Sequence, residues 1–267
     1  MTKRIQDSFT RLKRDKSKGF IAYVTAGDPS LDETVEIAEL LADSGVDLIE
    51  LGIPFSDPLA DGRVNQEAAE RALAAGATWT GVLRSVEEIR KKVDLPIIFF
   101  SYLNPLYAVG FDSAMKSATS AGVDGMLLLD MPIEESSTFD ETMRASHLDK
   151  IPLITPTTPP ERMSRILESA SGFVYCVSRT GVTGEQAQIE ASADALIDET
   201  RRHTQLPIAL GFGISNQEQA AEAAQFADAV VVGSAIVKRF HTEDRNAAGR
   251  RSAARWVAGL VQAVKEI

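Results

Sequence analysis

Two carboxylates, Glu50 and Asp61, lie on either side of an abrupt change in the character of the chain. Glu50 closes a short apolar run that predicts a buried strand, and Gly52, Pro54 and Pro58 then interrupt regular structure. A strand end followed by a loop is where α/β enzymes hold the groups that do chemistry. Taken alone, the pattern leaves two readings open: a carboxylate pair for acid–base catalysis, or a helix-capping Asp and a solvated loop Glu, which is the commoner role of single acidic residues.

Three glycine-rich segments later in the chain predict a phosphate site. They are Gly181–Gly184, Gly211–Gly213 and Gly233-Ser234, and each follows one of the last three predicted strands. Glycines let backbone N–H groups approach an anion, and a helix that starts at Ser234 adds positive potential. Turn formation explains any one segment alone, but their joint position is typical of the phosphate site in parallel barrels. We expect a substrate with a phosphomonoester at one end and its reacting centre toward the two carboxylates.

The remaining side chains narrow the chemistry further. None of the ten lysines falls at the C-terminal end of a predicted strand, which disfavours a Schiff-base aldolase. His147, His203 and His241 are far apart in the predicted order of elements, so they form no zinc triad. Asp57 and Asp130 carry the oxygen ligands that magnesium takes, but nothing in their spacing requires a metal. We expect acid–base catalysis with neither a metal nor an organic cofactor.

The elements that position these residues repeat one unit, a strand followed by a helix. Apolar strands alternate with amphipathic helical segments such as Leu31–Ala42 and Gln217–Ala224, and most strands are continuous apolar runs, as parallel strands buried on both faces are. Eight such units predict a single (β/α)₈ barrel, an α/β TIM-barrel fold over residues 1–267, with a doubly wound open sheet as the alternative. The predicted strands are Phe20–Val24, Asp47–Leu51, Pro96–Phe100, Gly125–Leu129, Pro152–Thr155, Phe173–Val177, Pro207–Leu210 and Ala229–Val232.

The two ends of such a barrel have different tasks, because catalytic residues gather where the strands end. This rule places Glu50, Tyr102, Asn104, Asp130, Tyr175 and Arg179 near the catalytic mouth, and Lys18, Asp47, Lys150 and Asp228 at the bottom, where a stabilising role is expected. Before the first strand, Ile5, Phe9 and Leu12 recur at helical spacing. They predict an extra N-terminal helix that covers one end of the fold.

Composition excludes several classes of partner. The chain has 267 residues, a net charge of −10 and a hydrophobic fraction of 44%, which supports a full core. Since no basic face balances the negative charge, we expect neither a nucleic-acid nor a membrane partner. A single cysteine, Cys176, rules out an intrachain disulfide and suits a cytoplasmic protein.

The motifs resemble the signature segments of the tryptophan synthase α chain family, and the resemblance covers essentially the full chain. The matching segments are Glu50–Gly62, Ser178–Gly184, Tyr102–Pro105, Gly211–Ser215 and Val232–Ala235. The family implies a lyase of tryptophan biosynthesis, which cleaves indole-3-glycerol phosphate to indole and glyceraldehyde 3-phosphate in a retro-aldol reaction.

The resemblance also implies a role for each matching residue. Glu50 would be the acid–base carboxylate, and Asp61 would steady the indole N–H as positive charge develops there. Tyr175 matches a position near the glycerol part of the substrate. The phosphate cradle matches Gly184, Gly211, Gly213, Gly233 and Ser234. The indole pocket would be walled by Tyr102, Leu127, Leu129 and Phe212, for which core packing is the alternative reading.

The loops 54–63 and 179–188 match two lids, with Asp57, Arg179 and Thr183 as lid residues and simple solvation as the alternative for Arg179. The family implies a tryptophan synthase β chain as partner in an α₂β₂ heterotetramer, with indole passing through a tunnel. Asp57, the first lid and Asn104-Pro105 would face that partner, which holds the pyridoxal phosphate.

Two residues depart from the family pattern just after Asp61. Arg63 stands where proline is expected, and Asn65 where an apolar residue is expected, which puts the stiffness of the first lid in question. Three other functions stay open. They are a stand-alone indole-3-glycerol-phosphate lyase that releases free indole, a barrel that only binds phosphate ligands and regulates a partner, and another cofactor-free aldolase or isomerase.

Overall fold

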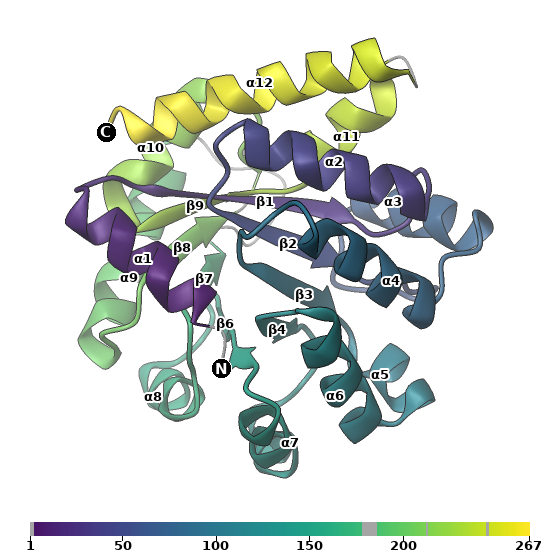
Figure 1. Cartoon of the computed structure of the whole chain (residues 1–267). Helices are drawn as coiled ribbons and strands as arrows, with labels where there is room; N and C mark the ends of the chain where they lie inside the picture. Colours follow the sequence, from purple (N-terminus) through teal and green to yellow (C-terminus); the bar gives the residue numbers. More distant parts are fainter. Residues whose placement is uncertain (1–2, 178–185, 212, 244–245) are drawn as a thin grey trace.

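The computed structural model describes residues 3–177, 186–211, 213–243 and 246–267. Parallel strands form one curled sheet with helices around its outside (Figure 1). The strand order is β5-β4-β3-β2-β1-β9-β8-β7-β6. The bounds are β1 Gly19–Thr25, β2 Leu48–Gly52, β3 Ile97–Ser101, β4 Gly125–Leu128, β5 Asp149–Lys150, β6 Leu153–Ile154, β7 Val174–Val177, β8 Ile208–Gly211 and β9 Ala229–Val232.

Two of these nine segments are halves of one strand, and together they close the barrel. β5 pairs with β4 and β6 pairs with β7, so the first and last segments of the sheet order are consecutive in the chain. Between them, Ile151 donates its N–H to Met126 on the β4 side, and Pro152 accepts the N–H of Tyr175 on the β7 side. Proline has no N–H of its own, which is why the strand divides here; it begins at Asp149, three residues before the predicted start at Pro152. The eight-stranded barrel prediction is confirmed.

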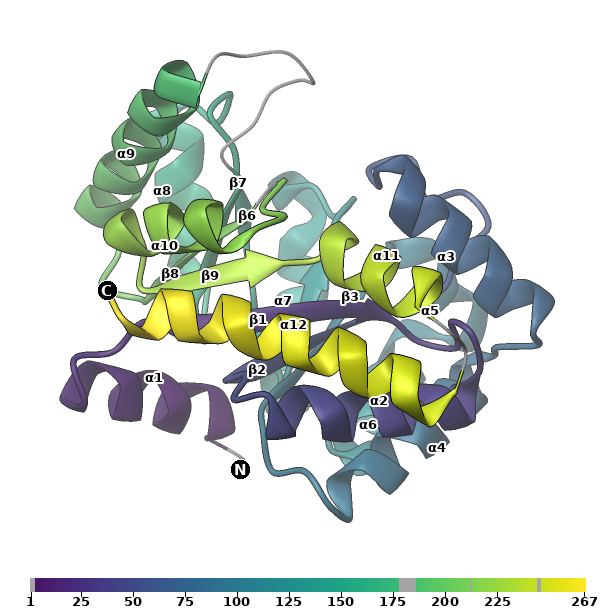
Figure 2. The ribbon, with the colours of Figure 1, turned by 90° about the horizontal axis from the view of Figure 1, so that it is seen from above.

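The helices fill the outer layer. Their bounds are α1 Arg4–Arg14, α2 Leu31–Asp43, α3 Arg63–Ala74, α4 Trp79–Arg90, α5 Leu103–Val109, α6 Phe111–Ala121, α7 Ile133–Ala145, α8 Pro160–Glu168, α9 Gln186–His203, α10 Gln217–Phe226, α11 Ser234–Thr242 and α12 Ala247–Lys265. α2 and α12 pack against each other beside β1 (Figure 2). Within the described ranges, no helix has the length and apolar character needed to cross a membrane.

The core has two layers, and the alternation of β1 shows how they are made. Phe20, Ala22 and Val24 point outward into the layer between sheet and helices, whereas Ile21 points into the barrel. The interior layer also holds Ile5, Phe9 and Leu12 of α1. The N-terminal helix therefore plugs the end of the barrel where the strands begin, as predicted (Figure 2).

Aspartates at the entry of strands tie this lower end together. Asp47, Asp124 and Asp228 each accept the first free N–H of a neighbouring strand, from Phe20, Ile97 and Ile208 respectively, at 2.8–2.9 Å. Each is also ion-paired, for example Asp124 with Arg90 and Arg4 and Asp47 with Arg11 and Lys265. Lys18 donates to the carbonyl of Ala227. The bottom of the barrel serves stability.

Candidate active site

Glu50 lies inside the barrel on β2, where its side chain is almost fully buried. Its register partner on β1 is Tyr23, and residues paired in this way point to the same face of a parallel sheet. Glu50 is 1% exposed, and its Oε1 atom has no hydrogen-bond partner among the described residues. Burial, and next the charge of Asp61, raises the pKa of Glu50 to about 8. The raised pKa favours the protonated, neutral form of Glu50 at neutral pH.

Asp61 closes the loop that follows β2, and Tyr102 holds it. The Tyr102 hydroxyl donates to Asp61 Oδ2 at 2.8 Å and accepts the N–H of Ala60 at 2.9 Å. Burial raises the pKa of Asp61, while hydrogen bonds from Tyr102 and Asn65 act in the opposite direction. The structure thus brings the two predicted carboxylates within electrostatic reach of each other, in different environments.

Two tyrosines complete the electrostatic surroundings, and sequence reasoning found only one of them. Tyr175, on β7, is partly buried, and its pKa is raised well above the usual value by burial and by the charge of Glu50. Tyr23 is 5% exposed, and burial followed by the charge of Asp61 raises its pKa as well. Tyr23 could have been predicted from the sequence, because the alternation of side chains along Phe20–Val24 places it on the inward face, and it pairs with Glu50.

Both tyrosine hydroxyls lie over glycines of the adjacent strand. A Cβ atom on Gly52 would sit 2.3 Å from the Tyr23 hydroxyl oxygen, and one on Gly211 would sit 2.5 Å from that of Tyr175. These positions admit only glycine because the phenol group occupies the space of a side chain. The Tyr23 ring packs edge-on against Phe100, with centroids 5.2 Å apart. Phe100 is a second interior aromatic residue that sequence reasoning missed.

The predicted phosphate end lies at the C-terminal ends of β8 and β9. Gly211 ends β8, Gly213 has a positive φ of 69°, and Gly233 precedes Ser234, the first residue of α11. Backbone N–H groups in the first turn of a helix have no intrahelical acceptor, so they are available to an anion. Gly184, Thr183, Arg179 and Phe212 lie outside the described residues.

The remaining predicted site residues are the proposed indole-pocket residues and two further aspartates. Leu127 is fully buried in the interior cluster, and Leu129 packs against that cluster. Tyr102 is 5% exposed, and its ring packs at a tilt against Phe55 with ring centroids 5.3 Å apart. Asp130 accepts the N–H of Leu103 at 2.8 Å and so caps the start of α5. Asp57 accepts a hydrogen bond from Ser56 at 2.6 Å, and the part of the chain that is described contains no cluster of metal ligands.

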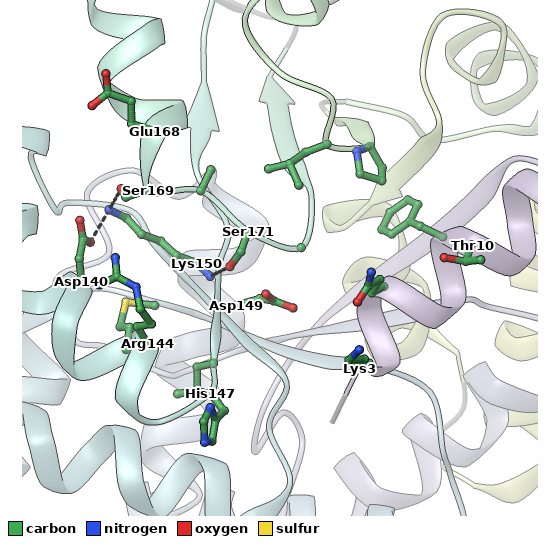
Figure 3. A pocket seen from close by; sticks show the side chains of 18 of the residues that line it. Lys3, Thr10, Asp140, Arg144, His147, Asp149, Lys150, Glu168, Ser169 and Ser171 are labelled. Atoms are coloured by element: carbon green, nitrogen blue, oxygen red, sulfur yellow. Dashed lines mark hydrogen bonds and ion pairs between the residues drawn. The ribbon is translucent and has the colours of Figure 1, made fainter. Parts of the chain in front are cut away.

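A cavity of about 650 Å³ lies at the opposite end of the barrel, between α1, α7 and α8 (Figure 3). Lys150 and Asp140 in its lining have a structural role. Lys150 binds Asp140 at 2.6 Å and Ser169 at 2.8 Å, and its backbone N–H donates to Ser171. Burial raises the pKa of Asp149, which lies in the same cavity. This cavity contains neither of the two catalytic candidates, so it is not the site where they act.

Comparison with known proteins agrees with this geometry. The family model described as tryptophan synthase alpha chain matches residues 9–266. The tryptophan synthase alpha chain of Opitutus terrae is 47% identical over 234 residues, 88% of each chain, and that of Geobacter sulfurreducens is 43% identical over 98% of each. The crystal structure of tryptophan synthase subunit alpha from Legionella pneumophila superposes with a TM-score of 0.92 at 34% identity over 100% of both chains. The chain belongs to the tryptophan synthase alpha chain family.

Proposed function

We propose that Glu50 and Asp61 are the catalytic pair with which this chain performs the family's lyase reaction, the cleavage of indole-3-glycerol phosphate to indole and glyceraldehyde 3-phosphate. One observation carries the assignment: Glu50 is buried inside the barrel with its Oε1 atom unpartnered among the described residues, near a second carboxyl, Asp61, that the Tyr102 hydroxyl holds by a hydrogen bond. When the surroundings of two carboxyl groups push their pKa values apart, the two groups can take separate acid and base roles.

The reaction balances with these two groups alone. Protonated Glu50 gives its proton to carbon 3 of the indole ring, and the ring nitrogen gains positive charge. The Glu50 carboxylate then takes the proton of the hydroxyl on the adjoining glycerol carbon. The carbon–carbon bond breaks, its electrons return to the ring, and indole and the aldehyde are released. Glu50 ends with the proton it started with.

Asp61 stabilises the charge that forms between these two steps. An anionic carboxylate beside the ring N–H strengthens its hydrogen bond as the nitrogen becomes positive, so it favours the intermediate over the substrate. Hydrogen bonds from Tyr102 and Asn65 oppose the effect of burial and support the anionic form. Tyr102, Leu127, Leu129 and Phe212 are proposed walls of the indole pocket.

The phosphate end of the substrate is proposed to bind near the start of α11. Gly211, Gly213, Gly233, Ser234 and Gly184 form the proposed cradle, with Tyr175 beside the glycerol portion. The support is the start of α11 at Ser234, directly after β9, where amide groups and the helix dipole favour a dianion. Neutral donors suffice here even though the chain carries a net charge of −10.

The family implies a β-chain partner, and we propose the α₂β₂ assembly with the first lid and α5 toward it. Leu59 is 92% exposed, Tyr107 51% and Val109 40%, an unusual exposure of large apolar side chains. Asp57, Arg179 and Thr183 are proposed lid residues. The pyridoxal phosphate belongs to the partner. A cytoplasmic location and a single domain over residues 1–267 are part of the same proposal.

The test measures glyceraldehyde 3-phosphate released from indole-3-glycerol phosphate by the purified chain, with and without a tryptophan synthase β chain. Weak activity that rises sharply with the partner supports the proposal. Fast activity that the partner leaves unchanged identifies the stand-alone lyase instead. Absence of cleavage in both conditions overturns the assignment of Glu50 and Asp61.

A further inference from the structure

A second cavity lies at the end of the barrel where the strands begin, away from both catalytic candidates. Its volume is about 570 Å³, and it lies between the C-terminal half of α1 and the connection from α9 to β8. It adjoins the cavity of Figure 3, with which it shares Phe9, Lys13, Leu206 and Pro207. Binding sites for small molecules typically have volumes of about 300–1,000 Å³, so this cavity has the size of a metabolite site.

The lining of this cavity is basic, although the chain as a whole has a net charge of −10. The cavity is lined by four cationic side chains, those of Lys13, Lys16, Lys18 and Arg201, and by one anionic side chain, that of Asp228. Arg201 is paired with Asp228 through two nitrogen–oxygen contacts of 3.2 Å. The three lysines therefore carry positive charge that no further carboxylate of the described lining offsets.

Lys13 and Lys16 differ from the other cations at the C-terminal end of α1. Arg11 and Arg14 each bind an aspartate at 2.8 Å, and cations in the last turn also stabilise the end of a helix. The side chains of Lys13 and Lys16 have neither an ion pair nor a hydrogen-bond partner among the described residues. Their ammonium groups are therefore available to an anion from outside the chain.

Backbone contacts hold these lysines in place at the edge of the cavity. Lys16 has a left-handed backbone conformation with a φ of 51°, which is common where a helix ends, and the next N–H, of Ser17, donates to the carbonyl of Leu12 at 2.9 Å. Lys18 donates its Nζ to the carbonyl of Ala227 at 2.8 Å. An ammonium group has three N–H donors, so Lys18 keeps two for a ligand.

The opposite wall supplies apolar surface and neutral donors. Leu206 and Pro207 line the cavity and are partly exposed. The hydroxyl of Thr204 accepts the N–H of Leu206 at 3.1 Å, which leaves its own proton available, and Gln205 adds an exposed amide. A ligand in this cavity would meet cations on one side and an apolar surface with two hydrogen-bond donors on the other.

We propose that this cavity is a binding site for a small organic polyanion, a phosphate ester with two or more negative charges and an apolar group. Lys13, Lys16 and Lys18 bind the charged oxygens, and the apolar group lies on Leu206 and Pro207. Charge-assisted hydrogen bonds to phosphate are among the stronger polar contacts, and three cations around one concave site favour a multiply charged ligand. This site is separate from the proposed phosphate cradle at the start of α11, and it does not rest on the proposed function.

The test is a titration of the full chain with adenosine triphosphate in the absence of divalent cations, followed by calorimetry and by amide NMR spectra. We expect saturable binding that shifts the backbone amide signals of Ser17, Thr204 and Gln205. Adenosine, which has the flat group but not the charges, should not bind at the same concentrations. The double substitution Lys13→Glu and Lys16→Glu should lower the affinity about tenfold or more, because it replaces two charge-assisted contacts by repulsion.

Arg14→Glu is the matched control, because it makes the same change of charge in the same part of α1 at a side chain outside the cavity lining. It should leave the affinity within about threefold of wild type at physiological salt, where exposed charges are screened over about 8 Å. Thermal unfolding checks that each variant keeps the fold. Absence of binding, affinity that survives the double substitution, or an equal loss in Arg14→Glu overturns the inference. Because no turnover is measured, the result is independent of the proposed function.

Discussion

At the scale of single residues, burial and hydrogen bonding separate two side chains of the same chemistry. Glu50 is enclosed by the barrel and lacks a partner for Oε1 among the described residues, so its neutral form is favoured. Asp61 is less buried; burial still raises its pKa, but the hydrogen bond from Tyr102 acts against that rise. The proposed division into proton donor and charge stabiliser follows from these surroundings.

Replacing Glu50 by Gln should abolish most cleavage while substrate binding persists. The amide keeps the shape of the side chain but has no proton to give or take. Acid–base groups contribute about 10²–10⁴-fold, and kcat should fall by that factor. Steady-state rates at pH 7.5 with a parallel binding titration provide the measurement. A rate within a few-fold of wild type would contradict the role of Glu50.

Asp61→Asn should lower kcat strongly as well, since the amide removes the negative charge that is needed beside the ring nitrogen. The fall in kcat, as opposed to a rise in KM alone, is the decisive quantity. Steady-state kinetics over a wide range of substrate concentration separate the two. An effect confined to KM would make Asp61 a binding residue only.

The raised pKa of Glu50 also predicts how stability depends on pH. Between the ordinary value near 4.5 and the folded value of about 8, the unfolded chain loses a proton that the folded chain keeps. Stability due to this residue is present at low pH and is lost as pH rises, by about 1 kcal/mol per pH unit within that window. Glu50→Gln should therefore gain stability relative to wild type between pH 5 and 8. Urea unfolding at several pH values measures it, and a constant difference would refute the buried, neutral Glu50.

At the scale of elements, the strand-entry aspartates connect neighbouring strands at the end of the barrel where the strands begin. Asp124→Ala removes the acceptor of the Ile97 N–H and leaves Arg90, whose side chain is 11% exposed, without its carboxylate. Breaking a buried pair from one side lowers the free energy of unfolding by about 3–5 kcal/mol. Asp94→Ala is the control, because Asp94 binds Arg4 while its side chain is 90% exposed. Its removal should change stability by about 0.5 kcal/mol or less, and denaturant unfolding of both variants compares them. Equal losses would contradict the role of burial.

At the scale of the whole molecule, the barrel has two different ends. The candidate active site lies where the strands end (the working end), and the ion-paired aspartates lie where the strands begin. The proposed partner face at the working end includes Leu59, and its side chain is too exposed to support the fold. Leu59→Asp should leave thermal stability unchanged but weaken β-chain binding by tenfold or more, as expected for loss of a central apolar anchor. Ile267→Asp introduces the same charge at the C-terminus, which lies near the α1 end of the barrel (Figure 2). Calorimetric titration with a β chain compares the variants, and equal affinities would exclude Leu59 from the interface.

The sequence by itself determined the eight-unit pattern, the extra helix and the carboxylate pair. Apolar runs and their proline or aspartate entries are local signals, and they placed every predicted strand except the fifth within one residue of its observed bounds. Because parallel strands end on one side, the same pattern also sorted Glu50 and Tyr175 from Asp47 and Asp228.

Only the tertiary structure decided which side chains meet. The register of β1 against β2 brought Tyr23 beside Glu50, and the path of the loop after β2 brought the Asp61 carboxylate to the Tyr102 hydroxyl. It also showed Asp130 to be a helix cap, an ordinary structural role. These contacts join atoms from separate elements, and their geometry depends on strand register and loop path, which no local pattern of the chain encodes.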